Sequence, residues 1–513
     1  MPIPKKIEFL NGLDYLEIDP QNFKVISDGN VDGCAIVAEA LERYKNKLFF
    51  DDVKPSERDD PSSKRRKRLG SLGSLRLRSS RLDFRFECES EPHPKMDEAY
   101  ELSVDVSSGN VSSSLLRAQT SWGLLRGMET LSQLIFSLGS GLYGVQTVSI
   151  EDEPRFSHRG YMLDTARHYI SVDKIFNLID AMAFNKLNVF HWHLVDDQSF
   201  PYESSSFPRV SQQASFRPHM VYTQDNVSSI IRYASRRGIR VIPELDSPGH
   251  TYSMRYIPNL LTKCYNSTTK TPTGELGPVN PIKSDTYEKI SKLVDELSQV
   301  FTDPYFHAGG DEVDFECWKS NPKVNRWMKV NNMTGNYTKL SNYYIEGING
   351  ILANHRKTML VWQEAFDDGA NLSNDTIVQV WKGINEMPEF MGELNKVVSS
   401  GYQALLSSCW YLNYIDYGQD WIKFYKCDPT GEPINKENAH LVLGGEVCMW
   451  TEFVDDTNVV SRTWPRASAA AERLWSPKTS SDIEDFLHRL EQMRCRLLYR
   501  GIEAEPVNGP GYC

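Results

Sequence analysis

The sequence has no long hydrophobic run. No stretch approaches the roughly eighteen consecutive apolar residues of a membrane-spanning helix, so no part of the chain is expected to cross a membrane. The first residues, from Met1 to Lys6, also lack the hydrophobic core of a secretion signal. Either a signal peptide has been removed or the protein is cytosolic.

Motifs of several common chemistries are missing as well. The chain has no GxSxG elbow, which serine hydrolases of the α/β-hydrolase fold use, and no GxxxxGK[ST] cradle for phosphate. Its nine cysteines include no CxxC pair and no Cys/His cluster, so they look structural rather than metal-binding. A net charge of −11 argues against nucleic acid as the partner.

Features that are present favour the secretory route. Asn-x-Ser/Thr sequons, the acceptors of N-linked glycans, occur seven times, at Asn110, Asn226, Asn266, Asn332, Asn336, Asn371 and Asn374. Cysteine spacing suggests three disulfides, Cys34–Cys88, Cys264–Cys317 and Cys495–Cys513, and leaves open the pairing of Cys409, Cys427 and Cys448. Because the count is odd, at least one thiol stays unpaired if the others bridge.

Residues 1–153 have the pattern of a smaller α+β unit. Ranges 34–50 and 122–138 show the spacing of amphipathic helices. Ranges 82–87 and 101–106 alternate polar and apolar residues, as half-buried strands do. The acidic stretch from Glu151 to Pro154 marks the expected boundary of this unit.

Range 54–80 of this unit is charged and rich in Ser and Gly, which predicts a solvated loop. Its basic run, residues 64–68, offers a proteolytic processing site as the alternative.

Residues 154–513 alternate between strand and helix patterns. Most of the strand patterns are continuous apolar runs, as expected of parallel strands buried on both faces; they span 159–164, 187–196, 239–246, 305–312, 358–364, 376–381, 402–408 and 441–450. Helical patterns fill several gaps, for example 172–184, 226–237 and 287–301. Eight such units predict an α/β fold, a (β/α)8 TIM barrel that forms the catalytic domain. An open doubly wound sheet is the rival, but no GxGxxG motif follows any of these strands.

Most strand ends carry polar or aromatic side chains. Catalytic groups of such barrels gather at the carboxyl ends of the strands, where the loops form the active-site face. In chain order the groups are Asp164 with Arg167, Asp196-Asp197, Asp246 with His250, Asp311-Glu312, Trp362 with Glu364, Trp381, Trp410-Tyr411, and Trp450 with Glu452. Polar or aromatic side chains at so many strand ends together indicate a pocket at the carboxyl end of the barrel.

The stretch His-Ala-Gly-Gly-Asp-Glu at 307–312 is the most informative of these ends. Its glycines let another backbone or a ligand come close. Neighbours in a strand point to opposite faces, so Asp311 and Glu312 address a substrate together only where the strand is ending. That arrangement suits two carboxyl groups with different functions.

A metal site is the first alternative for this pocket. His191 and His193 share one strand face, and His250, His307 and Asp311 could complete a site of amidohydrolase type. The first two histidines, however, lie several residues before the end of their run. We therefore interpret them as core histidines and expect neither a metal nor a cofactor.

The remaining composition fits a sugar pocket, because aromatic rings cover the apolar face of a sugar while carboxylates and arginine bind its hydroxyls. Glycoside hydrolysis needs an acid for the leaving oxygen and a group that stabilises an oxocarbenium-like centre. Adjacent Asp311 and Glu312 are too close in sequence to flank a glycosidic bond as the usual opposed pair. A substrate that supplies its own nucleophile removes this difficulty.

Several long motifs resemble the β-N-acetylhexosaminidases of glycoside hydrolase family 20, particularly its lysosomal members. They include DTARHY at 164–169, KLNVFHWHLVDD at 186–197, DSPGH at 246–250, GGDEV at 309–313, VWQE at 361–364, WYLN at 410–413, GEVCMW at 445–450 and WPRA at 464–467. Arg159-Gly160 also matches. The resemblance runs from Trp122 to Cys513 and is more diffuse before that.

The resemblance implies exo-acting hydrolysis of terminal β-linked N-acetylglucosamine or N-acetylgalactosamine from an oligosaccharide or glycoconjugate, by a retaining, substrate-assisted mechanism. Glu312 would be the general acid, and the substrate acetamido group would form an oxazolinium intermediate held by Asp311 and Tyr411. Other roles carried over are acid tuning by Asp196 and His250, a wall of Trp362, Trp381 and Trp450, and hydroxyl binding by Arg167, Glu452 and Asn413.

One departure from the family pattern bears on the substrate. Members that accept anionic sugars carry Arg immediately after Tyr-Leu-Asn, where this chain has Tyr414, and Lys382-Gly383 replaces their basic-acidic pair. We therefore expect a preference for neutral sugars, although Lys382 keeps an anionic substrate open. A catalytically inactive sugar-binding protein on the same barrel is the alternative function. The resemblance further implies a homodimer and a lysosomal or secreted location.

Overall fold

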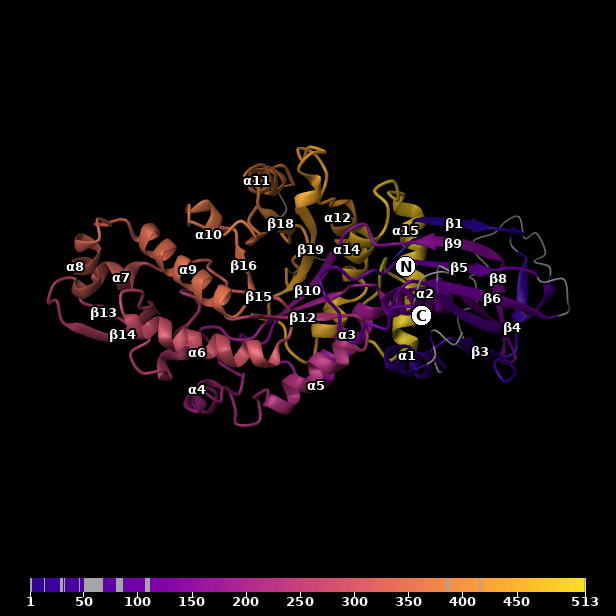
Figure 1. Cartoon of the computed structure of the whole chain (residues 1–513), viewed down its shortest axis with the longest axis horizontal. Coiled ribbons are helices and arrows are strands. Elements are labelled where there is room, and N and C mark those ends of the chain that lie inside the picture. Colours follow the sequence, from indigo (N-terminus) through magenta and orange to yellow (C-terminus); the bar gives the residue numbers. More distant parts are fainter. Residues whose placement is uncertain are drawn as a thin grey trace.

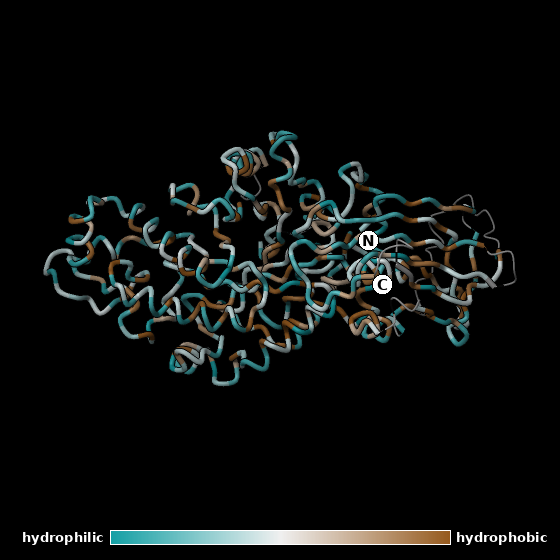
Figure 2. The backbone as a smooth tube through the Cα atoms, in the orientation of Figure 1, coloured by the Kyte–Doolittle hydropathy of each residue, from teal (hydrophilic) through white to brown (hydrophobic). Residues whose placement is uncertain are grey.

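The computed structural model describes residues 2–12, 14–27, 31, 33–45, 47–49, 68–79, 86–106, 111–383, 387–414, 416, 418–511 and 513. The molecule is elongated, with an N-terminal sheet at one end, a barrel in the middle and a small helical extension at the other end (Figure 1). Figure 2 shows hydrophobic residues in short pieces along the coloured part of the chain. No helix among the described residues is both long and apolar enough to cross a membrane.

The N-terminal unit is a nine-stranded sheet in the order β1-β9-β5-β6-β4-β2-β8-β7, with β3 paired to β4. Its strands are β1 (Lys6–Phe9), β2 (Tyr15–Ile18), β3 (Lys24–Ser27), β4 (Arg68–Ser79), β5 (Tyr100–Val104), β6 (Val111–Ala118), β7 (Ile135–Gly139), β8 (Leu142–Gln146) and β9 (Val148–Asp152). Helix α2 (Ser121–Leu134) lies against β5 and β6, and α1 (Ala35–Lys45) packs on α2.

Two predictions for this unit are wrong. The helix expected over 122–138 ends at Leu134, because Ile135 adopts extended backbone and begins β7, which pairs with β8. The loop expected over 54–80 contains β4, which pairs in parallel with β6 and buries Leu72, Leu75 and Leu77 in the core. Ser and Gly between those leucines concealed the strand pattern.

Three other sequence predictions lie wholly or mainly outside the described residues. The basic run 64–68 is outside except for Arg68, and so is most of the strand expected over 82–87. The sequon at Asn110 is also outside.

The second unit is a closed barrel of eight parallel strands, which confirms the predicted fold class. The strands are β10 (His158–Asp164), β11 (Val189–His193), β12 (Arg240–Glu244), β15 (Tyr305–His307), β16 (Thr358–Trp362), β17 (Ile377–Val380), β18 (Gln403–Leu406) and β19 (Val442–Met449). All eight predicted runs contain a strand, and β19 closes the barrel onto β10. Most strands are shorter than their runs, because the residues after each end turn into loops.

Helices surround this barrel. They are α3 (Val172–Phe184), α4 (Pro208–Ala214), α5 (Gln224–Ser235), α6 (Ser284–Val300), α9 (Tyr337–Asn354), α10 (Glu364–Asp367), α11 (Met387–Ser399), α12 (Trp421–Lys426), α13 (Val459–Thr463), α14 (Arg466–Trp475) and α15 (Ile483–Tyr499). Two 3-10 turns lie outside these helices, η1 (Tyr252–Tyr256) between β12 and β13 and η2 (Ala439–Leu441) directly before β19. The extension holds the hairpin β13 (Leu261–Tyr265) with β14 (Pro272–Val279), together with α7 (Glu316–Ser320) and α8 (Pro322–Val330).

The N-terminal unit covers the amino end of the barrel. Arg159, the second residue of β10, donates to both oxygens of Glu98, and Arg126 of α2 donates to the same carboxylate at 2.8 Å. At a second contact, Arg496 of α15 donates to the backbone oxygens of Ser132 and Gln133 in α2. The N-terminal unit therefore leaves the opposite, carboxyl end of the barrel uncovered, and a functional site can form there. We propose the division between the units at residues 153 and 154, in the segment that joins β9 to β10.

Four disulfides cross-link the described chain. They comprise the three pairs suggested by spacing, Cys34–Cys88, Cys264–Cys317 and Cys495–Cys513, and in addition Cys409–Cys427. Cys448 is the free thiol, and it is buried. Cys264–Cys317 ties β13 to α7 in the extension.

Candidate active site

The loop after β15 separates the two adjacent carboxylates. Residues Gly309 (φ +69°), Gly310 (φ +103°) and Glu312 (φ +47°) all have left-handed backbone, which only glycine adopts freely. Gly309 also packs directly on Asp246, since a Cβ at this position would lie 1.6 Å from its Oδ1. The strand predicted through Glu312 therefore ends at His307, because this close approach requires a turn.

The turn sends the two acids to different environments. Asp311 points inward and is 7% exposed, whereas the side chain of Glu312 is 59% exposed at the mouth of the site. Oδ1 of Asp311 is buried and has no hydrogen-bond partner among the described residues. A buried acceptor without a partner is costly, so this oxygen is a natural place for a ligand N–H.

His250, from the loop after β12, lies between these carboxylates and Asp196. Its Nε2 is 3.6 Å from Oδ2 of Asp311 and 3.7 Å from Oε2 of Glu312, and its Nδ1 is 3.3 Å from Oδ1 of Asp196. Burial lowers the pKa of His250, but the hydrogen bond to Asp196 and the charges of Asp246 and Asp311 outweigh it and raise that pKa to about 10. His250 is therefore an imidazolium ion at neutral and acidic pH.

Arg167 anchors the opposite side of Asp196. Its Nη2 lies 2.9 Å from Oδ2 of Asp196 and its Nη1 3.4 Å from Oδ2 of Asp164. The guanidinium also lies over the ring of Trp450, 4.9 Å from the ring centroid. Burial would raise the pKa of Asp196, but hydrogen bonds from His193 and His250 and the charge of Arg167 hold it well below its usual range. Asp196 is therefore ionised.

An aromatic cluster lines the barrel end next to the acids. It packs Trp362, Trp381, Tyr411 and Trp450 with Met162 and Cys448. The rings of Trp362 and Trp450 are 5.9 Å apart, and those of Trp381 and Tyr411 are stacked at 6.4 Å. Burial raises the pKa of Tyr411 well above its ordinary value, so its hydroxyl stays a neutral donor. The four aromatic residues come from the ends of four neighbouring strands, β16 to β19, and Met162 from β10.

The remaining predicted residues lie at the rim. Glu452 is exposed, and Asn413 has a buried Oδ1 without a hydrogen-bond partner among the described residues. Lys382 is paired at 3.1 Å with Glu364, whose other oxygen accepts the indole N–H of Trp381 at 2.8 Å. Burial, followed by the charge of Asp311, raises the pKa of Glu364.

The histidines considered as metal ligands are bound to carboxylates in the barrel interior. His191 lies 2.8 Å from Glu446 and 3.1 Å from Glu244, and His193 lies 2.6 Å from Glu244 and 2.8 Å from Asp196. Both ring nitrogens of each histidine already face a carboxylate. The close grouping of His191 with Glu244 is thus explained by ion pairing, and His307 faces the same carboxylate through its Nδ1 at 3.2 Å.

Sequence reasoning missed Glu244 and Glu446. Both are fully buried: Glu446 lies within β19, and Glu244 is the last residue of β12, two residues before the end of the run predicted there. Their only signal is a carboxylate inside an apolar strand run, which is rare unless the group is paired.

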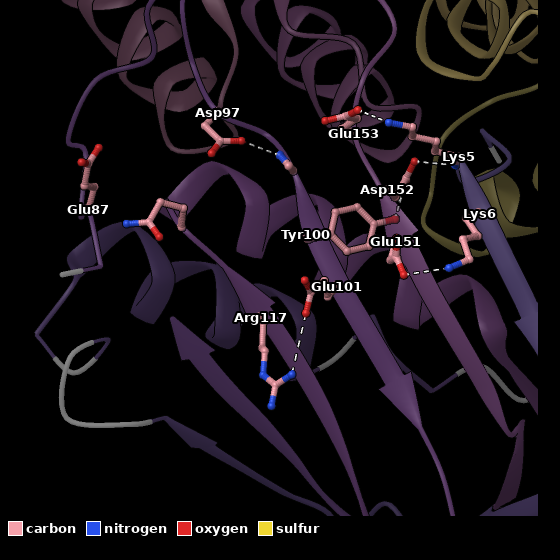
Figure 3. Close-up of a pocket in the computed structure, with 12 residues that line it drawn as sticks. Lys5, Lys6, Glu87, Asp97, Tyr100, Glu101, Arg117, Glu151, Asp152 and Glu153 are labelled. Atoms are coloured by element: carbon pink, nitrogen blue, oxygen red, sulfur yellow. Dashed lines mark hydrogen bonds and ion pairs between the residues drawn. The ribbon is translucent and has the colours of Figure 1, made fainter. Parts of the chain in front are cut away.

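A separate cavity of about 820 Å³ opens over the N-terminal sheet. Six of its charged side chains pair with one another, Lys5 with Glu153, Lys6 with Glu151 and Arg117 with Glu101 (Figure 3). It lies on the unit that covers the amino end of the barrel, so it is not part of the site at the carboxyl end.

A (β/α)8 barrel whose carboxyl end combines paired carboxylates, an arginine and an aromatic wall is the framework of a glycoside hydrolase. Residues 156–478 match the glycosyl hydrolase family 20 catalytic domain, and residues 1–134 match a domain described as beta-acetyl hexosaminidase like. The chain therefore belongs to glycosyl hydrolase family 20.

Individual relatives agree with this assignment. Beta-hexosaminidase subunit beta of Mus musculus is 43% identical over 520 residues, which cover 100% of this chain and 92% of the relative. Beta-hexosaminidase subunit alpha of Bos taurus is 44% identical over 506 residues, 97% of this chain and 92% of the relative. Among solved structures, the Flavobacterium johnsoniae chitobiase superposes with a TM-score of 0.80 at 30% identity, covering 98% of this chain and 73% of that chain.

Proposed function

We propose that this protein removes terminal non-reducing β-linked N-acetylglucosamine or N-acetylgalactosamine from glycoconjugates, with retention of configuration. The observation that carries the proposal is the separation of two adjacent carboxylates, one buried with a free acceptor oxygen and one at the mouth. Such a pair suits a reaction in which the substrate acetamido group replaces the enzyme nucleophile.

Glu312 acts as the general acid in this proposal. Its exposed carboxyl group can reach the glycosidic oxygen, protonate it as the bond breaks, and then take a proton from the water that opens the intermediate. His250 at 3.7 Å is an imidazolium ion, so it stabilises the carboxylate that forms when the proton leaves. Asp196, which Arg167 anchors, holds that imidazolium in place.

Asp311 and Tyr411 act on the acetamido group. Oδ1 of Asp311 accepts its N–H and stabilises the positive charge of the oxazolinium ring, while the neutral hydroxyl of Tyr411 donates to its oxygen. As this oxygen attacks the anomeric carbon, the bond to the leaving group breaks and Glu312 supplies the proton. Trp362, Trp381 and Trp450 enclose the acetamido methyl group and the sugar ring, which excludes water.

Arg167, Glu452 and Asn413 bind ring hydroxyls in this arrangement. The buried, unpartnered Oδ1 of Asn413 fits an acceptor for a sugar hydroxyl.

A neutral terminal sugar is the preferred substrate. Lys382 is ion-paired with Glu364. Tyr414 occupies the place where family members that accept anionic sugars carry arginine. These two positions therefore offer no unpaired cation to a charged sugar. The test compares a chromogenic N-acetylglucosaminide with its 6-sulfated form. Faster hydrolysis of the sulfated compound would contradict the preference.

We also propose a homodimer in the lysosome or outside the cell. Relatives carry the names of alpha and beta subunits, which supports assembly of two chains. Four disulfides fit an oxidising compartment, and the sequon asparagines Asn266, Asn332, Asn336, Asn371 and Asn374 are exposed. Asn226 is half-buried because its side chain takes part in the capping box of α5. Sedimentation and glycosidase treatment of the purified protein test both points.

Turnover decides between the enzyme and an inactive sugar-binding protein. We expect hydrolysis of a chromogenic N-acetylglucosaminide, inhibition by a thiazoline that mimics the cyclised sugar, and much slower hydrolysis of the matched glucoside with a 2-hydroxyl group. Binding of the thiazoline without turnover would identify a sugar-binding protein. Equal rates on the two glycosides would exclude the substrate-assisted mechanism.

A further inference from the structure

The interior of the barrel contains an unbroken chain of alternating carboxylates and imidazoles. It begins at the amino end with His158, whose Nε2 lies 2.6 Å from Oε1 of Glu446. Oε2 of Glu446 is 2.8 Å from Nδ1 of His191, and Nε2 of His191 is 3.1 Å from Oε2 of Glu244. All four side chains are at most 2% exposed, so water cannot replace any member of the chain.

Glu244 is the point at which this chain divides. Its Oε2 faces Nδ1 of His193 at 2.6 Å, and its Oε1 accepts the indole N–H of Trp362 at 2.8 Å. Oε1 also faces Nδ1 of His307 at 3.2 Å. One buried carboxylate thus contacts both an aromatic wall residue of the pocket and a histidine of the interior chain.

The branch through His193 ends at the general acid. Nε2 of His193 lies 2.8 Å from Oδ2 of Asp196, and Oδ1 of Asp196 lies 3.3 Å from Nδ1 of His250. Nε2 of His250 then faces Oε2 of Glu312 at 3.7 Å. Three side chains, His193, Asp196 and His250, therefore separate Glu244 from the group that donates the proton.

We propose that Glu244 is a positioning residue that couples the acetamido pocket at Trp362 to the proton-donating arm His193–Asp196–His250–Glu312. The inference rests on the function proposed above for Trp362 and Glu312. A carboxylate is planar and its two oxygens move together. Any displacement of Trp362 by the acetamido methyl group is therefore passed to His193, because breaking either buried hydrogen bond is costly.

The charges along the chain support this coupling. Burial opposes ionisation, but neighbouring carboxylates raise the pKa of His191 to about 9 and that of His193 to about 10, and the histidines hold the pKa of Glu244 well below its usual range. Burial leaves His307 neutral by lowering its pKa. Glu446, Asp246 and the thiol of Cys448 complete the titratable groups around Glu244.

A functional consequence follows for substrate selection. A ligand that fills the acetamido pocket fixes Trp362 and, through Glu244, the acid. A sugar without the N-acetyl arm leaves both less well ordered. Selectivity for the N-acetyl group is then expressed in kcat as well as in KM, because the proton donor itself depends on the occupied pocket.

A double-mutant cycle tests the coupling. Trp362→Phe removes the N–H that Glu244 accepts, and His193→Gln keeps a donor at the Nε2 position facing Asp196 while removing the Nδ1 contact with Glu244. We expect the losses in kcat/KM on a chromogenic N-acetylglucosaminide to be non-additive by about fivefold or more, since both changes break one shared link. His158→Gln, a matched change of a buried imidazole at the far end of the chain, should be additive with Trp362→Phe within about twofold.

The Glu244→Gln variant gives an independent readout. The glutamine side chain can retain hydrogen bonds to both neighbours, but the substitution removes the charge that keeps His193 protonated. Asp196 then loses a cationic partner and its pKa rises, so the acidic limb of the kcat/KM profile should move to higher pH. A structural role alone would lower the thermal midpoint without moving this limb.

The outcomes separate the two proposals. All rates are expressed per thiazoline-titrated site, so that only folded protein is compared, and the thermal midpoint of each variant is recorded. The coupling is overturned if the losses in kcat/KM of Trp362→Phe and His193→Gln are additive and the acidic limb of Glu244→Gln does not move. The proposed hydrolase function would still stand in that case. If His193→Gln does not fold, the acidic limb of Glu244→Gln decides alone. Indifference of the unmodified protein to the N-acetyl group would instead overturn the proposed function, and the coupling with it.

Discussion

His250 faces both Asp311 and Glu312, with its Nε2 3.6 Å from one carboxylate and 3.7 Å from the other. One imidazolium ion thus serves two adjacent acids that point to different places. The backbone turn at Gly309 and Gly310 makes this possible, because neighbours in a continuing strand would point to opposite faces. The same contact makes the site sensitive to changes at any of the three residues.

Replacement of Glu312 by glutamine should lower kcat by about 10² to 10⁴-fold on substrates with poor leaving groups. The proton donor is lost, whereas folding should persist because the side chain is mostly exposed. Steady-state kinetics with a thermal melt checks this. Glu316→Gln, an exposed carboxylate on α7, is the matched control and should change neither quantity.

Replacement of Asp311 by asparagine should impair hydrolysis of N-acetyl substrates severely. The neutral asparagine amide cannot supply the negative charge that stabilises the oxazolinium ring, although its oxygen can still accept the acetamido N–H. We therefore expect the loss in kcat to exceed the change in KM. Asp314→Asn, an exposed position three residues on, should behave as the unmodified protein. Normal turnover by Asp311→Asn would refute the substrate-assisted proposal.

Replacement of Gly309 by alanine should abolish activity and destabilise the loop after β15. The added methyl group would overlap Asp246, and the position has a φ of +69°. Gly335→Ala is the control, because its φ of +75° is similar but nothing lies within 4 Å of the added Cβ. The Gly335→Ala substitution should lower the free energy of unfolding by only about 1–2 kcal/mol, the penalty for left-handed backbone. Equal melting midpoints for the two variants would contradict the packing argument.

Stability should be greatest between about pH 4.5 and 6.5. His250 and His193 have folded pKa values of about 10 and His191 of about 9, all raised, so their contribution is fully present below the unfolded value of about 6.5 and is lost as pH rises through the folded values. The lowered pKa values of Asp196, Glu244 and Glu446 act in the other direction. Their contribution is present above the unfolded values of about 4 and is lost as pH falls further.

Thermal unfolding midpoints across pH 3 to 10 check this dependence. His158 and His307, whose pKa values burial lowers, subtract stability only below about pH 6.5 and so leave the alkaline fall unchanged. His250→Gln should flatten that fall, whereas His440→Gln, an exposed site, should not. A midpoint that rises steadily from pH 6.5 to 9 would contradict the charged state of the interior histidines.

Much of the fold could be predicted from single segments. Parallel strands buried on both faces require continuous apolar runs, and the eight runs of the barrel are long and well separated. The strand β4 escaped prediction because its leucines are spaced by Ser, Gly and Arg, and it is held by pairing with β6 rather than by its own pattern. In the same way, the end of β15 depends on the contact between Gly309 and Asp246, which lie far apart in the chain.

The sequence by itself determined the barrel, the order of polar groups at its strand ends and the motifs of the family. Those properties are local, since each depends on the residues of one segment. Only the tertiary structure decided that Asp311 is buried while Glu312 is exposed, and that Glu244 joins Trp362 to His193. These relationships depend on distances between strands. The partner of a buried carboxylate lies on another strand, so it is identified only once the strands are placed side by side.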